Sequence, residues 1–153
     1  MASNRHLGRI IALQTLYEVE FRMSAEDTKA TLDEVYKRNL DRYEKTVKDK
    51  AFVRRLVYGT YKNRAKLDKL IQPIAPEWPL EQIARIDLVI LELALYELTE
   101  MSDVVPPKVA INEAVELAKA FGSDNSSRFI NGVLGTAFRT LLKDTDNDSE
   151  TKV

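Results

Sequence analysis

The sequence lacks cysteine altogether and contains a single histidine, His6, among its 153 residues. Without cysteine the chain can form no disulfide framework, thiol nucleophile or thiolate metal site, as is common in a reducing compartment. The lone histidine lies near the start of the chain, outside the expected core, and offers no second imidazole for a metal site or a Ser/His pair. We therefore expect no metal and no cofactor.

An excess of charge of one sign is also missing, because 23 Lys and Arg residues are balanced by 24 Asp and Glu residues. A net charge of −1 argues against wrapping nucleic acid by bulk electrostatics, so any such contact must be local or shared with a partner. The longest apolar segment, residues 86–98, is too short for a bilayer and includes acidic residues. Basic residues interrupt the start, where a secretory signal would be apolar. We expect a cytoplasmic protein with no membrane association.

Motifs of common enzymes are absent as well. The sequence has no Gly-rich phosphate loop and no Gly-x-Ser-x-Gly elbow. Glu113 and Glu116 lie one helical turn apart, but on an amphipathic helix with lysines nearby they are typical of a solvated face. The sequence therefore predicts no catalytic residue and no enzymatic activity.

What the sequence does contain is apolar residues at helical spacing along most of its length, with no strand alternation of useful length. This pattern predicts an all-α fold. Ser24 and Asp27 resemble a capping arrangement that would open the second helix. Between residues 85 and 101 the apolar side chains point all round the axis, which predicts a central helix. The predicted helices span residues 4–22, 24–43, 48–71, 80–84, 85–101, 106–122 and 126–142.

Three prolines in residues 73–79 predict the end of the third helix and a linker. Trp78 in this linker is expected to anchor it to the core rather than to bind a ligand. The predicted parts are an N-terminal bundle at 1–72, the linker at 73–79, a C-terminal bundle at 80–142 and a disordered polar tail at 143–153.

The junction between the last two helices is a candidate binding site. Gly122 is expected to end one helix in the left-handed conformation, and the side-chain oxygens of residues 123–127 to cap the next. Its helix N-terminus would favour an anion such as phosphate. Arg128 adds a cation and Phe121 and Phe129 add aromatic faces, a mixture that suits single-stranded RNA. An ordinary capped turn with two core phenylalanines explains the same residues.

Three short blocks in the C-terminal half, LALYEL (93–98), KVAINEAVELAK (108–119) and FINGVL (129–134), together with ALQTLY (12–17), resemble the NusB family of bacterial transcription antitermination factors. The resemblance extends from about residue 4 to residue 142. It implies two small helical bundles packed together, about seven helices and a non-enzymatic role. It further implies binding, with the ribosomal protein NusE, to the boxA element of nascent ribosomal RNA in support of processive transcription. RNA polymerase and other Nus factors would be reached indirectly.

The same resemblance implies site residues. Those expected to bind RNA are Arg5, His6, Arg9, Phe121, Asn125, Arg128 and Phe129. Those expected to bind the protein partner are Asp87, Ile90 and Asn125. The arginine-rich start of the family is thin here, with only two arginines around His6 and Gly8. Because this basic start is thin, we expect weak RNA binding by the chain alone. By themselves, three basic residues near a terminus are more typical of a solvated helix end.

Two other functions fit parts of the sequence. A NusB-like domain also precedes the catalytic domain of some ribosomal RNA methyltransferases, but the residues after 142 are too few to form a cofactor-binding domain. The other alternative is a structural helical protein that self-associates as a homodimer through the face expected to bind RNA or the protein partner. A size measurement with and without boxA-type RNA separates self-association from RNA binding.

Overall fold

The structure is a computed structural model that describes residues 2–26 and 31–142. Those residues form seven α-helices and no β-strand, which confirms the predicted all-α fold. The chain divides into two compact units, Met1–Leu67 and Asp68–Val153, with the division inside α4 (Arg64–Ile74). The role of linker predicted for residues 73–79 stays a prediction. The tail predicted at 143–153 lies outside the described residues.

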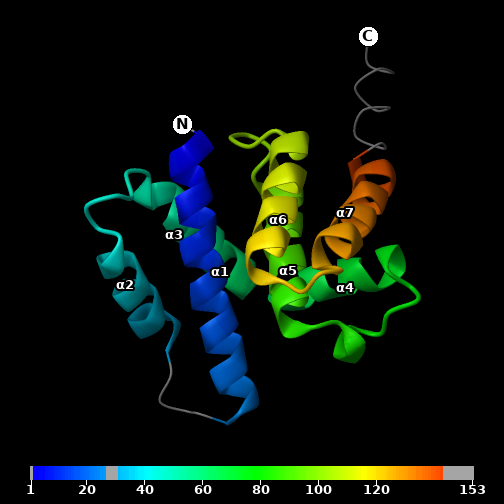
Figure 1. Cartoon of the computed structure of the whole chain (residues 1–153), viewed down its shortest axis with the longest axis horizontal. Coiled ribbons are helices and arrows are strands. Elements are labelled where there is room, and N and C mark those ends of the chain that lie inside the picture. The colour runs from blue at the N-terminus through cyan, green and yellow to red at the C-terminus, as the bar shows by residue number, and fades with distance from the viewer. Residues whose placement is uncertain (1, 27–30, 143–153) are drawn as a thin grey trace. The chain divides into compact units, whose positions relative to one another are not determined.

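The first unit is built on α1 (Ala2–Ser24), which contacts both α2 (Leu32–Arg42) and α3 (Lys50–Lys62) (Figure 1). Apolar residues at three- and four-residue spacing place a buried stripe on each of these helices. The buried apolar side chains include Ile11, Ala12, Leu13, Leu16, Val19, Val35, Phe52, Val53, Leu56 and Val57.

Polar contacts fix α2 against α1. The buried Asn39 amide donates to Thr15 Oγ1 at 3.0 Å. Nearer the surface, the Glu18 carboxylate accepts hydrogen bonds from Arg38 and, at 3.2 Å, from Arg22. The hydrogen bond from Arg38 holds the pKa of Glu18 below its usual value.

The second unit contains the end of α4, a 3₁₀ turn (Leu80–Gln82), α5 (Arg85–Glu100), α6 (Pro107–Phe121) and α7 (Ser126–Ala137). Helices α5, α6 and α7 contact one another pairwise (Figure 1). Every residue from 89 to 98 is buried. The all-round apolar pattern of this segment therefore predicted its enclosed position correctly.

The single long helix predicted at 48–71 is wrong, because α3 and α4 are separate helices that break at Asn63. The backbone N–H of Asn63 and its side-chain amide both donate to the Gly59 carbonyl, the latter at 2.8 Å. Arg64 also donates to the Tyr61 carbonyl at 3.1 Å. These side chains satisfy carbonyls at the end of α3. Because the apolar spacing continues through the break, the sequence pattern does not indicate it.

The predicted start of the second helix is also wrong. Ser24 is the last residue of α1, and its hydroxyl donates to the Phe21 carbonyl at 2.7 Å. Helix α2 is capped instead by Thr31, whose side chain accepts from the Glu34 N–H. Asp27, the other half of the predicted cap, lies outside the described residues.

Two helix ends differ from prediction. Pro73 lies inside α4, which ends at Ile74, so the prolines do not stop the helix where the sequence predicts. At the other end of the unit, α7 stops at Ala137 and a π-helical turn (Phe138–Leu142) follows it. The α-helix therefore ends before the predicted residue 142, which is the last residue of the π-helical turn.

Candidate nucleic-acid interface

The α6–α7 junction, residues 122–129, is held by contacts of Ser126. The Ser123 N–H donates to Ser126 Oγ at 2.9 Å, and the two hydroxyl oxygens lie 3.1 Å apart. Ser126 is only 2% exposed. A Cβ on Gly122 would lie 2.5 Å from Ser126 Cβ and 2.8 Å from the Ala118 carbonyl oxygen. The turn is therefore tightly packed, and it fixes the helix that carries Arg128 and Phe129.

Two details of the junction correct the sequence prediction. Gly122 has φ −90° and ψ −171°, so its backbone is extended and not left-handed. Asn125 is the N-cap residue of α7 but makes no side-chain capping hydrogen bond. Close approach to Ser126, rather than a positive φ, is what requires glycine here.

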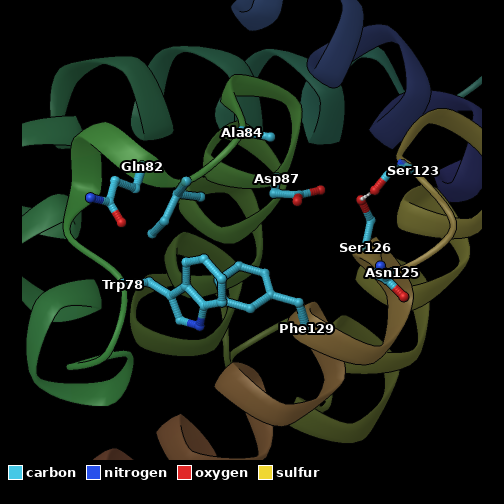
Figure 2. A pocket seen from close by; sticks show the side chains of 9 residues that line it. Trp78, Gln82, Ala84, Asp87, Ser123, Asn125, Ser126 and Phe129 are labelled. Atoms are coloured by element: carbon cyan, nitrogen blue, oxygen red, sulfur yellow. Dashed lines mark hydrogen bonds between the residues drawn. The ribbon is translucent and has the colours of Figure 1, made fainter.

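Phe129, on the first turns of α7, pairs with Trp78 from the proline segment. Their ring centroids lie 6.0 Å apart, with an interplanar angle of 74°, which is an edge-to-face arrangement (Figure 2). Phe129 is partly buried, whereas Trp78 is 48% exposed. Trp78 was expected to anchor its segment to the core. Its contact with Phe129 agrees with that expectation, but its large exposed fraction does not. We call these two residues the aromatic pair.

One side of the aromatic pair borders a hollow of about 220 Å³ that contains the side chain of Asp87 (Figure 2). We call it the Asp87 hollow; its lining also includes Gln82, Ile83, Ala84, Ser123, Asn125 and Ser126. Asp87 is 8% exposed, and its buried Oδ1 has no hydrogen-bond partner among the described residues. A buried polar atom without a partner is costly, so this carboxylate is suited to a donor from outside the chain.

The aromatic pair also borders a second hollow, of about 320 Å³, which we call the Arg128 hollow. Its lining consists of Ile74, Ala75, Pro76, Glu77, Arg128, Gly132, Val133, Thr136 and the aromatic pair. Arg128 is exposed, and the part of the chain that the structure describes offers it neither an ion pair nor a hydrogen bond. Its guanidinium is therefore available to an anion.

In the first unit, the start of α1 is tied to the turn before α3. Asn4 Oδ1 accepts from the N–H groups of Lys48 and Asp49, at 3.0 and 3.2 Å. The Arg5 and Arg9 guanidinium groups lie 4.9 and 5.1 Å from the centroid of the Phe52 ring. Arg5 also lies 3.7 Å from the Asp49 carboxylate. These contacts order the basic first turns of the helix.

The three basic residues predicted to bind RNA differ in burial. Arg5 and His6 are partly exposed, whereas Arg9 is 2% exposed. A buried guanidinium above an aromatic ring is suited to packing more than to binding a phosphate. Direct RNA contact by Arg9 stays a prediction that the burial does not favour.

The remaining predicted residues belong to the second unit. Asp87, Asn125 and Phe129 line the Asp87 hollow together. Phe121, at the end of α6, is 39% exposed and lines neither hollow, and Ile90 is fully buried. Sequence reasoning missed Trp78 as a candidate ligand contact; the available signal was a large aromatic residue among prolines, which is also typical of an anchor.

Within residues 2–26 and 31–142, no group of three acidic or histidine side chains could hold a metal ion. In the same ranges, no helix combines the length and the apolar character that a membrane crossing requires.

Comparison with known proteins gives one family. The model of the NusB family matches residues 6–139. The transcription antitermination protein NusB of Chloroflexus aggregans is 44% identical over 151 residues, covering 98% of this chain and 97% of that protein. The structure of T. maritima NusB, 31% identical, matches with a TM-score of 0.76 over 89% of this chain and 91% of that chain. A crystal structure of the antitermination factors NusB and NusE in complex with double-stranded RNA includes a chain of the same fold, 21% identical, with a TM-score of 0.74 over 91% of this chain and 98% of that one.

Proposed function

This chain belongs to the NusB family, and we propose that it acts as an RNA-binding transcription antitermination factor. Its RNA is the boxA element of nascent ribosomal RNA, which it binds with the ribosomal protein NusE. The role is non-enzymatic, in keeping with the family. Its place of action is the cytoplasm, and RNA polymerase and other Nus factors are engaged indirectly.

The observation that carries the RNA-binding role is the α6–α7 junction. Arg128 is exposed without a partner among the described residues, and Phe129 lies beside it on a turn packed around Ser126. A fixed cation next to an aromatic ring can contact a phosphate and a base of the same strand. Arg5 and His6, partly exposed at the start of α1, are the candidates in the first unit.

The observation that supports a protein partner is Asp87. A carboxylate that is 8% exposed, with one oxygen lacking a hydrogen bond, lies in a hollow beside Asn125. A lysine or arginine side chain from NusE would satisfy that oxygen with a charge-assisted hydrogen bond. We leave Ile90 out of this surface because it is fully buried. The neighbouring structure of NusB with NusE supports the choice of partner.

The near-neutral charge of the chain suggests how the affinity for RNA is divided between the chain and NusE. A net charge of −1 and two arginines at the start of α1 supply few phosphate contacts. NusE is proposed to supply many of the others. The slope of log affinity against log salt measures this directly, since each phosphate contact on a single strand contributes about 0.7 to it. Equal affinity and equal slope for the chain alone and for the complex would disprove the sharing.

The function is tested by the binding of a labelled boxA RNA and of a scrambled RNA of the same composition. We expect the chain with NusE to prefer boxA, and the chain alone to bind both RNAs weakly. Arg128→Ala should weaken binding, whereas Arg139→Ala, which removes the same charge from an exposed position outside both hollows, should not. Equal affinity for the two RNAs would refute the proposal, as would equal loss in the two variants.

Self-association is the competing outcome of a parallel size measurement. A homodimer that dissociates when RNA is added would mean that the RNA face is also the dimer face. A homodimer that binds RNA unchanged would place self-association elsewhere.

A further inference from the structure

Trp78 is held in an unusual position for the largest apolar side chain of the sequence. It is 48% exposed, although its segment is fixed by Pro76 and Pro79 and by hydrogen bonds at both of its backbone groups. The Trp78 N–H donates to the Ala75 carbonyl at 3.1 Å, and the Gln72 side chain donates to the Trp78 carbonyl at 3.1 Å. A tryptophan normally buries 150–250 Å² on folding, as a rough scale. This one is ordered without being enclosed.

The edge-to-face geometry of the aromatic pair covers few of its ring faces. In such a pair the edge of one ring covers one face of the other, so the remaining faces are not covered by the pair itself. Figure 2 shows the indole of Trp78 next to the ring of Phe129. Because Trp78 is 48% exposed, a planar aromatic group can reach its indole.

The charges of the two hollows decide which occupant each one suits. The Asp87 hollow contains a buried carboxylate and no basic side chain, whereas the Arg128 hollow contains an exposed guanidinium, with Glu77 at the exposed proline segment as its acidic residue. A phosphate is repelled by the carboxylate of the first hollow and can pair with the guanidinium of the second. The wall of the Arg128 hollow is also open at Gly132, where a Cβ would meet no atom within 4 Å.

We propose that Trp78 and Phe129 form a stacking site for an unpaired nucleobase, placed in the Arg128 hollow with a neighbouring phosphate against Arg128. This inference rests on the proposed RNA-binding function and adds Trp78 and the Arg128 hollow to its site. Base stacking on aromatic side chains does not depend on base identity, so the site adds affinity more than sequence preference. It requires an unstacked, single-stranded base, because the faces of bases inside a duplex are covered by their stacked neighbours.

Trp78 is the one tryptophan of the sequence, so its fluorescence reports on the site without labelling. Unlabelled boxA RNA is titrated into the chain with NusE. The same titration with Trp78→Phe gives the emission of the partner alone, which is subtracted. We expect saturable quenching of Trp78 with the affinity found by anisotropy of a labelled RNA. The same RNA annealed to its complement should not quench.

Substitutions give the second readout. Trp78→Leu should weaken RNA binding about 5- to 150-fold, the range typical of losing one stacked base, with Trp78→Phe in between. Gly132→Leu, which fills the Arg128 hollow without changing Trp78, should also weaken binding while the thermal stability is kept. This second variant keeps the test decisive if Trp78→Leu fails to fold.

The possible results separate the two proposals. RNA binding with unchanged Trp78 emission and an unaffected Gly132→Leu variant overturns the stacking site but leaves the RNA-binding function intact. A full change in emission on adding NusE, with no further change on adding RNA, assigns the hollow to the protein partner and also overturns it. Absence of RNA binding by the complex overturns the function and the stacking site together.

Discussion

The α6–α7 junction predicts a sharp effect for Gly122→Ala. The added Cβ would lie 2.5 Å from Ser126 Cβ and Oγ and 2.8 Å from the Ala118 carbonyl oxygen. Two of these three atoms belong to the backbone or lie next to it, so they cannot rotate away. The φ of Gly122 is −90°, which alanine adopts freely, so the whole penalty comes from the contacts and none from backbone strain.

Overpacking of this kind costs about 1–3 kcal/mol of unfolding free energy. For a chain of this length each kcal/mol lowers the melting temperature by about 2–4 °C, so a fall of about 2–12 °C is expected. Because the Ser126 contacts position Arg128, weaker RNA binding should accompany the lower stability.

Gly132→Ala is the matched control. Gly132 lies inside α7, and a Cβ there meets nothing within 4 Å. Replacing a helical glycine with alanine should stabilise the chain by about 0.5–1 kcal/mol. Thermal unfolding followed by circular dichroism should therefore give shifts of opposite sign for the two variants. A Gly122→Ala variant as stable as the parent, or stabilised like Gly132→Ala, would refute the tight packing of the junction.

Two further predictions concern the first unit. Arg9→Ala should destabilise the chain by about 1–3 kcal/mol in denaturant unfolding, because its guanidinium is buried over Phe52, and an unchanged midpoint would show that the arginine is not structural. Partial burial, and then the hydrogen bond that its hydroxyl donates to Asp33, raise the pKa of Tyr58 to about 12. Since the folded pKa lies above the ordinary tyrosine value of 10.0, this stabilisation is complete below pH 10.0 and is lost as the pH rises toward 12. The pKa of Tyr58 is measured by ultraviolet titration of tyrosinate, as the difference between the parent and Tyr58→Phe. A Tyr58 that titrates together with the ordinary tyrosines would contradict the prediction.

The sequence predicted those parts of the fold that depend on apolar periodicity. The apolar residues that lie all round the axis between 86 and 98 correctly predicted an enclosed helix, because such a helix must be surrounded. Periodicity failed at Asn63, where one side chain ends a helix without changing the apolar spacing. The left-handed helix end predicted from the residue type at Gly122 is also wrong, because the requirement for glycine arises from contact with Ser126 and not from local conformation.

The candidate site was predictable only in part. The residue types at Arg128 and Phe129 predicted a site for an anion and a nucleobase. In the structure Arg128 lines one hollow and Phe129 lines two. Burial of Arg9 could not be predicted, since the sequence does not show which basic side chain packs against Phe52. The surroundings of Trp78 could not be predicted either. They depend on its contact with Phe129, which joins segments far apart in the chain.

The salt dependence of boxA RNA binding by the chain with NusE tests the RNA contacts of Arg5 and Arg128. We expect the slope of log affinity against log salt to fall in magnitude by about 0.7 in Arg5→Ala and by about 0.7 in Arg128→Ala, one phosphate contact each. Arg139→Ala should leave the slope unchanged. No binding of boxA RNA, or the same slope for the parent and both variants, would contradict the assignment of RNA contacts to this chain.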